Sequence, residues 1–125
     1  MIAADTSTWI AYLQGNEGTD TRLLDRAIAD SQVVMPPAVL TEMLSDPKLS
    51  SEVTSSLLDL PMLDVNTGYW QRAGALRASV LARGRKARLG DALIAQSCVD
   101  HGVALITRDK DFIAFANAAN LDLIP

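Results

Sequence analysis

The chain has 125 residues, of which 49% are hydrophobic and 21% are charged, and its formal net charge is −4. This length and composition predict a single domain over residues 1–125, with a buried core and little room for a second domain. No apolar run reaches the roughly 18 residues of a membrane span, and residues 1–9 lack the basic start of a signal peptide. The single Cys98 cannot form an internal disulfide. We therefore expect no membrane association and a cytoplasmic location.

Short apolar runs alternate with longer amphipathic segments in the first half of the chain. Apolar residues at helical spacing predict helices, and short apolar runs bounded by turn residues predict strands. Pro36 and Pro37 end one of these strands and suit the first turn of the helix that follows. In chain order we predict a strand at residues 2–4, a helix from residue 9 to a stop near Gly15, a helix at 19–30, a strand at 33–35, a helix carrying residues 39–44, a helix at 50–58 and a strand at 61–65.

The second half continues the alternation and defines the fold class. We predict a helix marked by residues 69–80 that stops near Gly84, a helix at 91–100, a strand at 103–107, a short helix through residues 112–115 and a last strand at 121–124. Strands that alternate with helices predict an α/β fold, in which a parallel sheet has right-handed crossovers and helices on both faces.

The charges are unevenly distributed along the chain. Residues 1–66 carry ten acidic and three basic side chains, whereas residues 67–125 carry eight basic and five acidic ones. Four of the basic residues form a group between two predicted helices: Arg83, Arg85, Lys86 and Arg88. This basic group can contact phosphates locally although the whole protein is acidic. Taken alone, the pattern is more typical of a solvated helix end whose cations favour the negative pole of the helix dipole.

Two aspartates stand where an α/β fold places its functional side chains, at the carboxyl ends of the strands, and two further acids could join them. Asp5 follows the first strand and Asp109 the fourth, so both side chains open into one crevice if these strands are neighbours. Asp91 begins a helix just after Gly90, and Glu42 lies in a helix among apolar residues.

Each acid also has a purely structural interpretation. Asp5 can start a turn, Asp91 can be a helix-start acid favoured by the dipole, Asp109 can cap the next helix, and Glu42 can face water. Four acids that converge would repel one another unless a divalent cation neutralised them. Oxygen ligands of this kind suit Mg²⁺ or Mn²⁺, and a chain with one His and one Cys does not suit zinc.

The acidic segments, taken as an ordered set, resemble the four acidic motifs of the PIN-domain family. The segments are IAADTSTW, PPAVLTEML, GDALIAQSCVDHG and LITRDKDF, and the resemblance runs over essentially the whole chain. It implies a three-layer α/β/α domain with a parallel sheet of order 3-2-1-4-5. In that order the first and fourth strands are neighbours, as the crevice requires.

The resemblance also implies roles for individual residues. By motif position Asp5, Glu42, Asp91 and Asp109 are the catalytic acids, and three of them, Asp5, Asp91 and Asp109, hold Mg²⁺ or Mn²⁺. Three further residues are supporting: Thr6 and Thr107 match hydroxyl positions that orient the acids, and Asp111 matches a more variable acid. A metal-activated water would then hydrolyse RNA phosphodiesters, with the basic group guiding the RNA backbone towards Asp91.

Within this family the compact chain favours an endoribonuclease of the VapC type, the toxin of a toxin–antitoxin pair. Such a protein has an RNA substrate, a VapB-type antitoxin whose C-terminal segment blocks the acidic site, and usually a homodimeric state. The main alternative is a PIN-domain nuclease of RNA processing or decay, which has the same chemistry and no antitoxin. A receiver-like Mg²⁺-binding signalling domain is disfavoured because Asp5 lacks an acidic neighbour, and a binding-only PIN fold is disfavoured by the intact acids.

Two further interpretations concern aromatic residues and the histidine. Trp9, Tyr12, Tyr69 and Trp70 lie on predicted surface helices; core packing is the favoured role of the tryptophans, with interface contacts as the alternative. His101, next to Gly102, is predicted to be a C-terminal cap residue of a helix rather than a general base.

Overall fold

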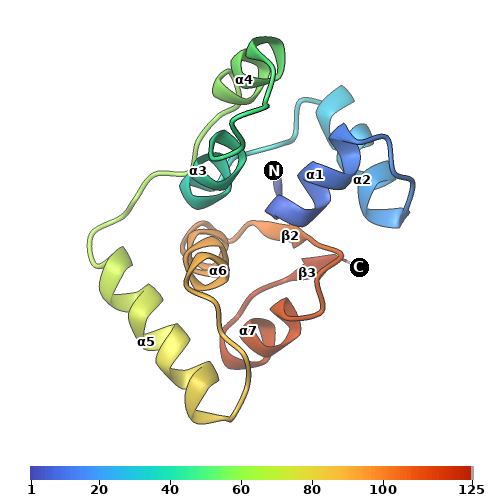
Figure 1. The fold of residues 1–125 in the computed structure, drawn as a ribbon. Coiled ribbons are helices and arrows are strands. Elements are labelled where there is room, and N and C mark those ends of the chain that lie inside the picture. The colour runs from blue at the N-terminus through green and yellow to red at the C-terminus, as the bar shows by residue number, and fades with distance from the viewer. Residues whose placement is uncertain (125) are drawn as a thin grey trace.

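The computed structural model describes residues 1–124 as seven helices and three short strands (Figure 1). In chain order these are β1 (Ile2–Ala4), α1 (Thr6–Leu13), α2 (Thr19–Ala29), α3 (Pro37–Leu44), α4 (Ser51–Leu58), α5 (Tyr69–Ala82), α6 (Leu89–His101), β2 (Ala104–Ile106), α7 (Phe112–Ala118) and β3 (Leu123–Ile124).

The sheet is parallel, and its central pair consists of a strand near the N-terminus and a strand from the last quarter of the chain. β1 pairs with β2, so that Ala3 lies opposite Leu105, and β2 pairs with β3. The strand pair that the crevice argument required is therefore present. Asp5 and Thr107, which directly follow these strands, stand at the same edge of the sheet.

Beyond β1 the sheet continues only as two isolated parallel bridges, Ile2 with Val33 and Met35 with Met62. The order in which the segments pair follows the predicted order 3-2-1-4-5. The predicted second and third strands, however, pair only through these single bridges and are not regular strands. Pro36 directly follows the bridge residue Met35, and Pro61 directly precedes Met62. Because proline has no backbone N–H to donate, these residues limit the ladder at both positions.

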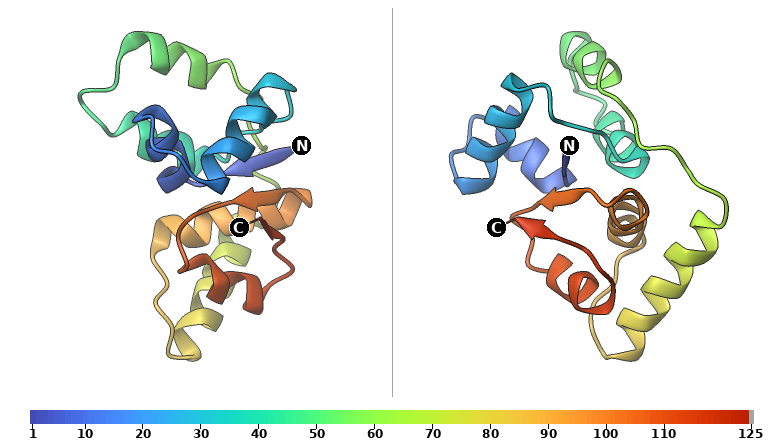
Figure 2. Two further views of the ribbon diagram at one scale, coloured as in Figure 1. Left: turned by 90° about the vertical axis from the view of Figure 1, so that its right-hand side faces the viewer. Right: turned by 180° about the vertical axis from the view of Figure 1, so that it is seen from behind.

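The sheet separates two helical layers, as the three-layer prediction required. Helices α1 to α4 lie on one side and α5 to α7 on the other (Figures 1 and 2). The core between the layers includes the fully buried side chains of Phe112, Phe115, Leu105, Ile106 and Ile94. None of the described helices is long and apolar enough to cross a bilayer.

Local sequence explains where several elements begin and end. Pro37 occupies the first turn of α3, and the Ser50 side chain accepts a hydrogen bond from the backbone N–H of Val53 at the start of α4. Gly102 ends α6 in the left-handed region, with φ of 60°, and turns the chain into β2. Helix α6 begins two residues before the predicted position, whereas β2 and β3 are shorter than the predicted strands at 103–107 and 121–124.

The two tryptophans differ in environment. Trp9 is 3% exposed and belongs to the core, as predicted, but Trp70 is 63% exposed, so the core interpretation was wrong for it. On α5 it is Tyr69 that turns inward, where its hydroxyl donates to the backbone oxygen of Leu93 over 2.6 Å. Consecutive helical residues point about 100° apart, which places Trp70 outside.

Candidate metal centre

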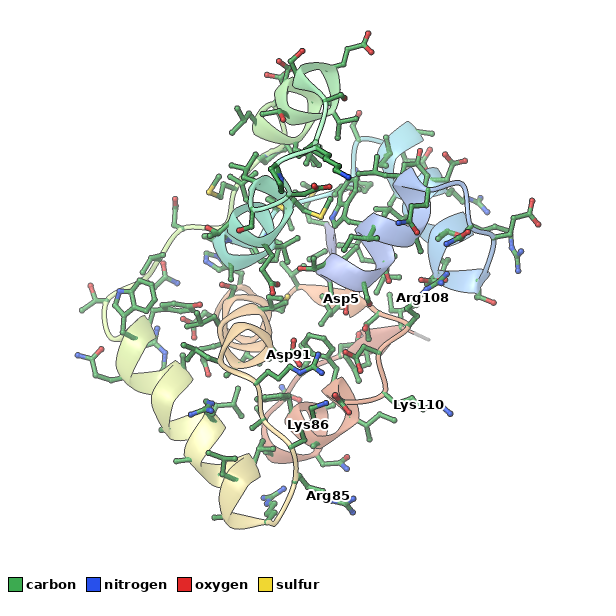
Figure 3. All side chains as sticks on the ribbon, viewed as in Figure 1. Asp5, Arg85, Lys86, Asp91, Arg108 and Lys110 are labelled. Carbon is green, nitrogen blue, oxygen red and sulfur yellow. The ribbon has the colours of Figure 1, made fainter. Side chains whose placement is uncertain are left out.

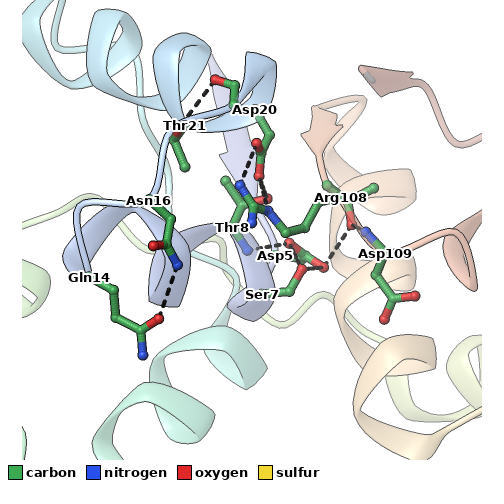
Figure 4. A network of polar contacts seen from close by, with 11 residues as sticks. Asp5, Ser7, Thr8, Gln14, Asn16, Asp20, Thr21, Arg108 and Asp109 are labelled. Atoms are coloured by element: carbon green, nitrogen blue, oxygen red, sulfur yellow. Dashed lines mark hydrogen bonds and ion pairs between the residues drawn. The ribbon is translucent and has the colours of Figure 1, made fainter.

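Asp5 is both a helix cap and a buried acid at the end of β1. Its carboxylate accepts the backbone N–H of Thr8 over 3.0 Å, which caps α1, and the hydroxyl of Ser7 over 2.8 and 2.9 Å. The Thr107 hydroxyl, which follows β2, donates to Oδ2 over 2.7 Å (Figure 4). Burial raises the pKa of Asp5, while the hydrogen bonds from Thr107 and Thr8 lower it. The turn-forming and site interpretations of Asp5 are therefore compatible.

Three further acids form a compact carboxylate cluster: Asp91, Asp109 and Asp111 each offer an oxygen, and these oxygens lie within 4.8 Å of one another. Asp91 is in the first turn of α6, and Asp109 follows β2. Asp109 does not cap α7, because Asp111 occupies the position before that helix; the Asp109 carboxylate instead accepts the Asp111 backbone N–H over 2.9 Å. This cluster contains Asp111, which the sequence placed only in a supporting role.

Glu42 reaches this region from the other side of the sheet. The Thr6 hydroxyl donates to its Oε1 over 2.6 Å, and its carboxylate lies against Gly90, where a Cβ atom would stand only 3.2 Å from Oε2. Its charge also contributes to raising the pKa of Asp91. Glu42 is on an exposed part of α3, yet its carboxylate is directed towards the cluster by the hydroxyl of Thr6.

Burial and the neighbouring carboxylates both affect the pKa of Asp91. Burial, followed by the negative charges of Asp109, Glu42 and Asp5, raises the pKa of Asp91 to about 6, against a smaller opposing effect of Arg88. Asp91 Oδ2 is also buried and has no hydrogen-bond partner among residues 1–124. A buried carboxylate oxygen without a donor is costly unless a cation compensates it.

A hard divalent cation fits this site. The clustered oxygens of Asp91, Asp109 and Asp111 are carboxylate oxygens, which suit Mg²⁺ or Mn²⁺. Cys98 is buried in the core, and His101 Nε2 lies 2.8 Å from the backbone oxygen of Asp64. His101 is in the last turn of α6 and Gly102 is its cap, so the histidine is held at a helix end.

The raised pKa of Asp91 predicts an unusual pH dependence of stability in metal-free protein. Its carboxyl group binds a proton more tightly when folded, with a pKa of about 6 against an ordinary 3.8. Its stabilising contribution is therefore complete below about pH 4 and is lost as the pH rises through 6. Thermal unfolding in EDTA should show this loss, and Asp91→Asn should remove it. Added Mn²⁺ should reverse the trend, because the cation binds the carboxylate form. An identical pH profile in the variant would contradict this assignment.

Gly90 offers a second test, because a side chain there would press on Glu42. In Gly90→Ala the new Cβ would displace the Glu42 carboxylate by a few tenths of an ångström. Alanine should leave stability unchanged or raise it by up to about 1 kcal/mol, since glycine is the poorer residue within a helix. We expect the metal-dependent phosphodiester hydrolysis that the motif resemblance implies to fall severalfold nonetheless. Gly74→Ala, in α5 where nothing lies within 4 Å of a Cβ, is the matched control. Equal activity of the two variants would show that Glu42 needs no such space.

Sequence reasoning missed an ion pair that supports the site. Arg108, between Thr107 and Asp109, donates from Nε and Nη2 to the carboxylate of Asp20 on α2 over 2.7 and 2.9 Å (Figure 4). Asp20 also accepts the Thr8 hydroxyl over 3.0 Å, and its pKa is lowered chiefly by the hydrogen bond from Arg108. The pair joins α2 to the loop after β2. Arg108 lies in LITRDKDF, but nothing in the local sequence singles out Asp20.

Part of the basic group (Arg83, Arg85, Lys86 and Arg88) lies beside the cluster, and its members have different partners. Lys86 Nζ lies 3.5 Å from Asp111 Oδ2, and Arg88 immediately precedes α6. Arg83 Nη1 donates to the backbone oxygen of Asn117 over 3.2 Å, and Arg85 is exposed (Figure 3). Lys86 and Arg88 are thus close to the acids, whereas Arg83 is partly engaged with α7.

Comparison with known proteins shows the family of the chain. Residues 2–118 match the PIN domain family. Ribonuclease VapC5 of Mycobacterium tuberculosis is 28% identical over 126 residues, which cover 96% of this chain and 91% of the relative. Ribonuclease VapC11 of the same organism is 27% identical over 128 residues, covering 97% and 96%.

The fold of the chain also matches the folds of proteins whose structures have been solved. A crystal structure of VapBC2 from Rickettsia felis, bound to a DNA fragment from their promoter, has a TM-score of 0.73 and 22% identity, and the match covers 99% of this chain and 98% of that one. An α/β domain with acids gathered at the ends of its central strands is the arrangement that the PIN domain defines. The chain belongs to the PIN-domain family.

Proposed function

We propose that the protein is a metal-dependent endoribonuclease of the VapC type, the toxin of a toxin–antitoxin pair. The observation that carries the proposal is the convergence of carboxylates from four separate segments around the unpartnered Oδ2 of Asp91. The names of its relatives, VapC ribonucleases of 27 and 28% identity along nearly the whole chain, support RNA as the substrate.

In this proposal Asp91, Asp109 and Asp111 hold the cation, with Asp5 beside them. A bound Mg²⁺ or Mn²⁺ would activate the attacking water and neutralise charge that develops on the phosphoryl oxygens. Asp5 is kept oriented by Thr107 and Ser7, which occupy part of its hydrogen-bonding capacity. This differs in emphasis from the ligand set expected at first, which held Asp5 as a direct ligand and Asp111 as a supporting residue.

Glu42 is the acid best placed to handle a proton. It is exposed, its Oε1 is held by Thr6, and its Oε2 faces Gly90 at the edge of the cluster. We propose that Glu42 orients the attacking water and accepts its proton. No covalent intermediate on a side chain is required.

Two protein partners follow from the same proposal. An antitoxin segment is the proposed occupant of a groove of about 410 Å³ between α1, α2 and α4, which Trp9, Ile28 and Leu57 help to line. A second copy of the chain is the proposed partner of the exposed apolar side chains of Trp70 and Leu89.

The nuclease proposal is tested with purified protein and end-labelled mixed single-stranded RNA. Cleavage should require Mg²⁺ or Mn²⁺, stop in EDTA and be absent from Asp91→Asn purified in parallel. Absence of cleavage by the wild-type chain, or equal cleavage by the variant, would refute the proposal. Expression of the wild-type chain without an antitoxin should arrest growth, whereas a processing nuclease should not.

A further inference from the structure

A cleft of about 410 Å³ adjoins the carboxylate cluster, between the loop that carries the basic group and α7. Its wall includes Asp111, which also belongs to the cluster, so the cleft opens directly beside the proposed metal. Arg85 and Lys86 line it from the loop, and Lys110 and Asn117 line it from the other side (Figure 3). Lys110 and Asn117 were not predicted from the sequence to contact RNA.

The cleft presents positive charge that ion pairs within residues 1–124 do not fully neutralise. Lys86 pairs with Asp111 at 3.5 Å, but both side chains are partly exposed, at 57% and 35%, so this pair is weak. Arg85 and Lys110 form no ion pair within residues 1–124, whereas Arg108 nearby is tied to Asp20. Arg85 and Lys110, which have no ion-pair partner in residues 1–124, therefore line a cavity whose one acid, Asp111, is already paired with Lys86.

The opposite side of the site has a different character. A cavity of about 280 Å³, which Glu42 helps to line, is lined mainly by apolar residues, including Trp70 and Leu89, and no lysine or arginine of residues 1–124 lines it. A phosphodiester chain in this cavity would therefore meet no lysine or arginine side chain of residues 1–124, unlike one in the cleft. In the cleft with Lys110, the exposed Ile113 also offers an apolar surface for a sugar or base.

We infer that this cleft is a subsite for the nucleotide next to the scissile bond, with Lys110 and Arg85 each contacting one of the two backbone phosphates that flank it. The inference rests on the proposed nuclease function and adds the path of the RNA: from the carboxylate cluster the strand passes between the basic loop and α7. Charge-assisted contacts from lysine and arginine are the usual means of holding such phosphates.

The test compares two double variants that change the net charge equally. Lys110→Gln/Arg85→Gln removes the unpaired cations of the cleft. Arg22→Gln/Lys48→Gln removes two exposed cations that line none of the cavities described here and form no ion pair in residues 1–124. Kinetics are measured on a labelled single-stranded RNA of about 12 nucleotides between roughly 50 and 200 mM salt.

The cleft variant should raise KM roughly tenfold with kcat and melting temperature unchanged, and its salt slope should fall by about 1.4, or about 0.7 for each phosphate contact on single-stranded RNA. The control should match the wild type, and Mn²⁺ binding should be the same in all three. An unchanged KM and salt slope, or an equal effect in the control, would overturn the inference.

Fluorescence anisotropy of the same RNA with Mn²⁺ separates the two proposals. If the wild-type chain binds the RNA without cleaving it, and only the cleft variant weakens binding, the nuclease proposal fails and the cleft stands. If it cleaves the RNA and the cleft variant binds normally, the cleft fails alone. If it neither binds nor cleaves, both fail.

Discussion

Replacing Asp91 with asparagine is expected to abolish metal-dependent RNA cleavage and, at the same time, to stabilise the metal-free protein. The amide keeps the shape of the side chain but removes a charged ligand from the cluster. It also removes the repulsion that, with burial, raises the pKa of Asp91 to about 6. We expect kcat to fall by at least about three orders of magnitude, or about 4 kcal/mol of transition-state stabilisation. At pH values above 6, the melting temperature of the variant in EDTA should be higher than that of the wild type.

Two other aspartates are useful comparisons for this experiment. Asp100, on the same helix, accepts two hydrogen bonds from Arg72 and lies outside the cluster. Asp100→Asn should therefore lower stability and leave cleavage intact, the reverse of Asp91→Asn. Asp5→Asn should also abolish cleavage while keeping the cap of α1, because the asparagine side-chain oxygen can still accept the Thr8 N–H. Full activity in Asp91→Asn would contradict the proposed site.

Substitution of Glu42 by glutamine is expected to lower kcat by about two orders of magnitude or more, about 2.7 kcal/mol. Glutamine preserves the acceptor for the Thr6 hydroxyl but cannot take a proton from water. The free energy of unfolding should change by no more than about 0.5 kcal/mol, because the residue is exposed. A role in proton transfer thus predicts a change in activity without a change in stability.

Glu52→Gln, at an exposed position on α4, is the matched control and should cleave RNA normally. Steady-state kinetics are measured at saturating and at limiting Mn²⁺, so that weakened metal binding is distinguished from slower chemistry. Near-normal cleavage by Glu42→Gln under both conditions would remove Glu42 from the site and leave it as a solvent-facing residue of α3.

The α/β class and the crevice could be predicted from the sequence because both depend on patterns that are local along the chain. Apolar runs that end at Asp5 and Thr107 indicate two strands with polar residues at their carboxyl ends, and the pairing of β1 with β2 brings those ends together. The segments around the acids also carry the family resemblance. Strand regularity was less predictable, since Pro36 and Pro61 reduce the outer pairs to single bridges.

Contacts between distant segments were not accessible in the same way. Asp20 and Arg108 are far apart in the sequence, and no periodicity links them. Asp111 enters the cluster because the backbone turns at Asp109, whose carboxylate accepts the Asp111 N–H. Likewise, the orientation of Trp70 away from the core depends on Tyr69 being the residue of α5 that packs on α6. Such details follow from packing rather than from residue type.

The most direct test of the central claim is the chemical analysis of the RNA ends produced by the purified wild-type protein with Mn²⁺. The carboxylates would hold a cation that activates water. His101, the one histidine of the chain, lies at a helix end and is hydrogen-bonded to the backbone oxygen of Asp64. Attack should therefore come from water and not from the ribose 2′-hydroxyl. The account predicts products without a 2′,3′-cyclic phosphate and no products in EDTA. Cyclic phosphate ends, or cleavage that persists in EDTA, would contradict it.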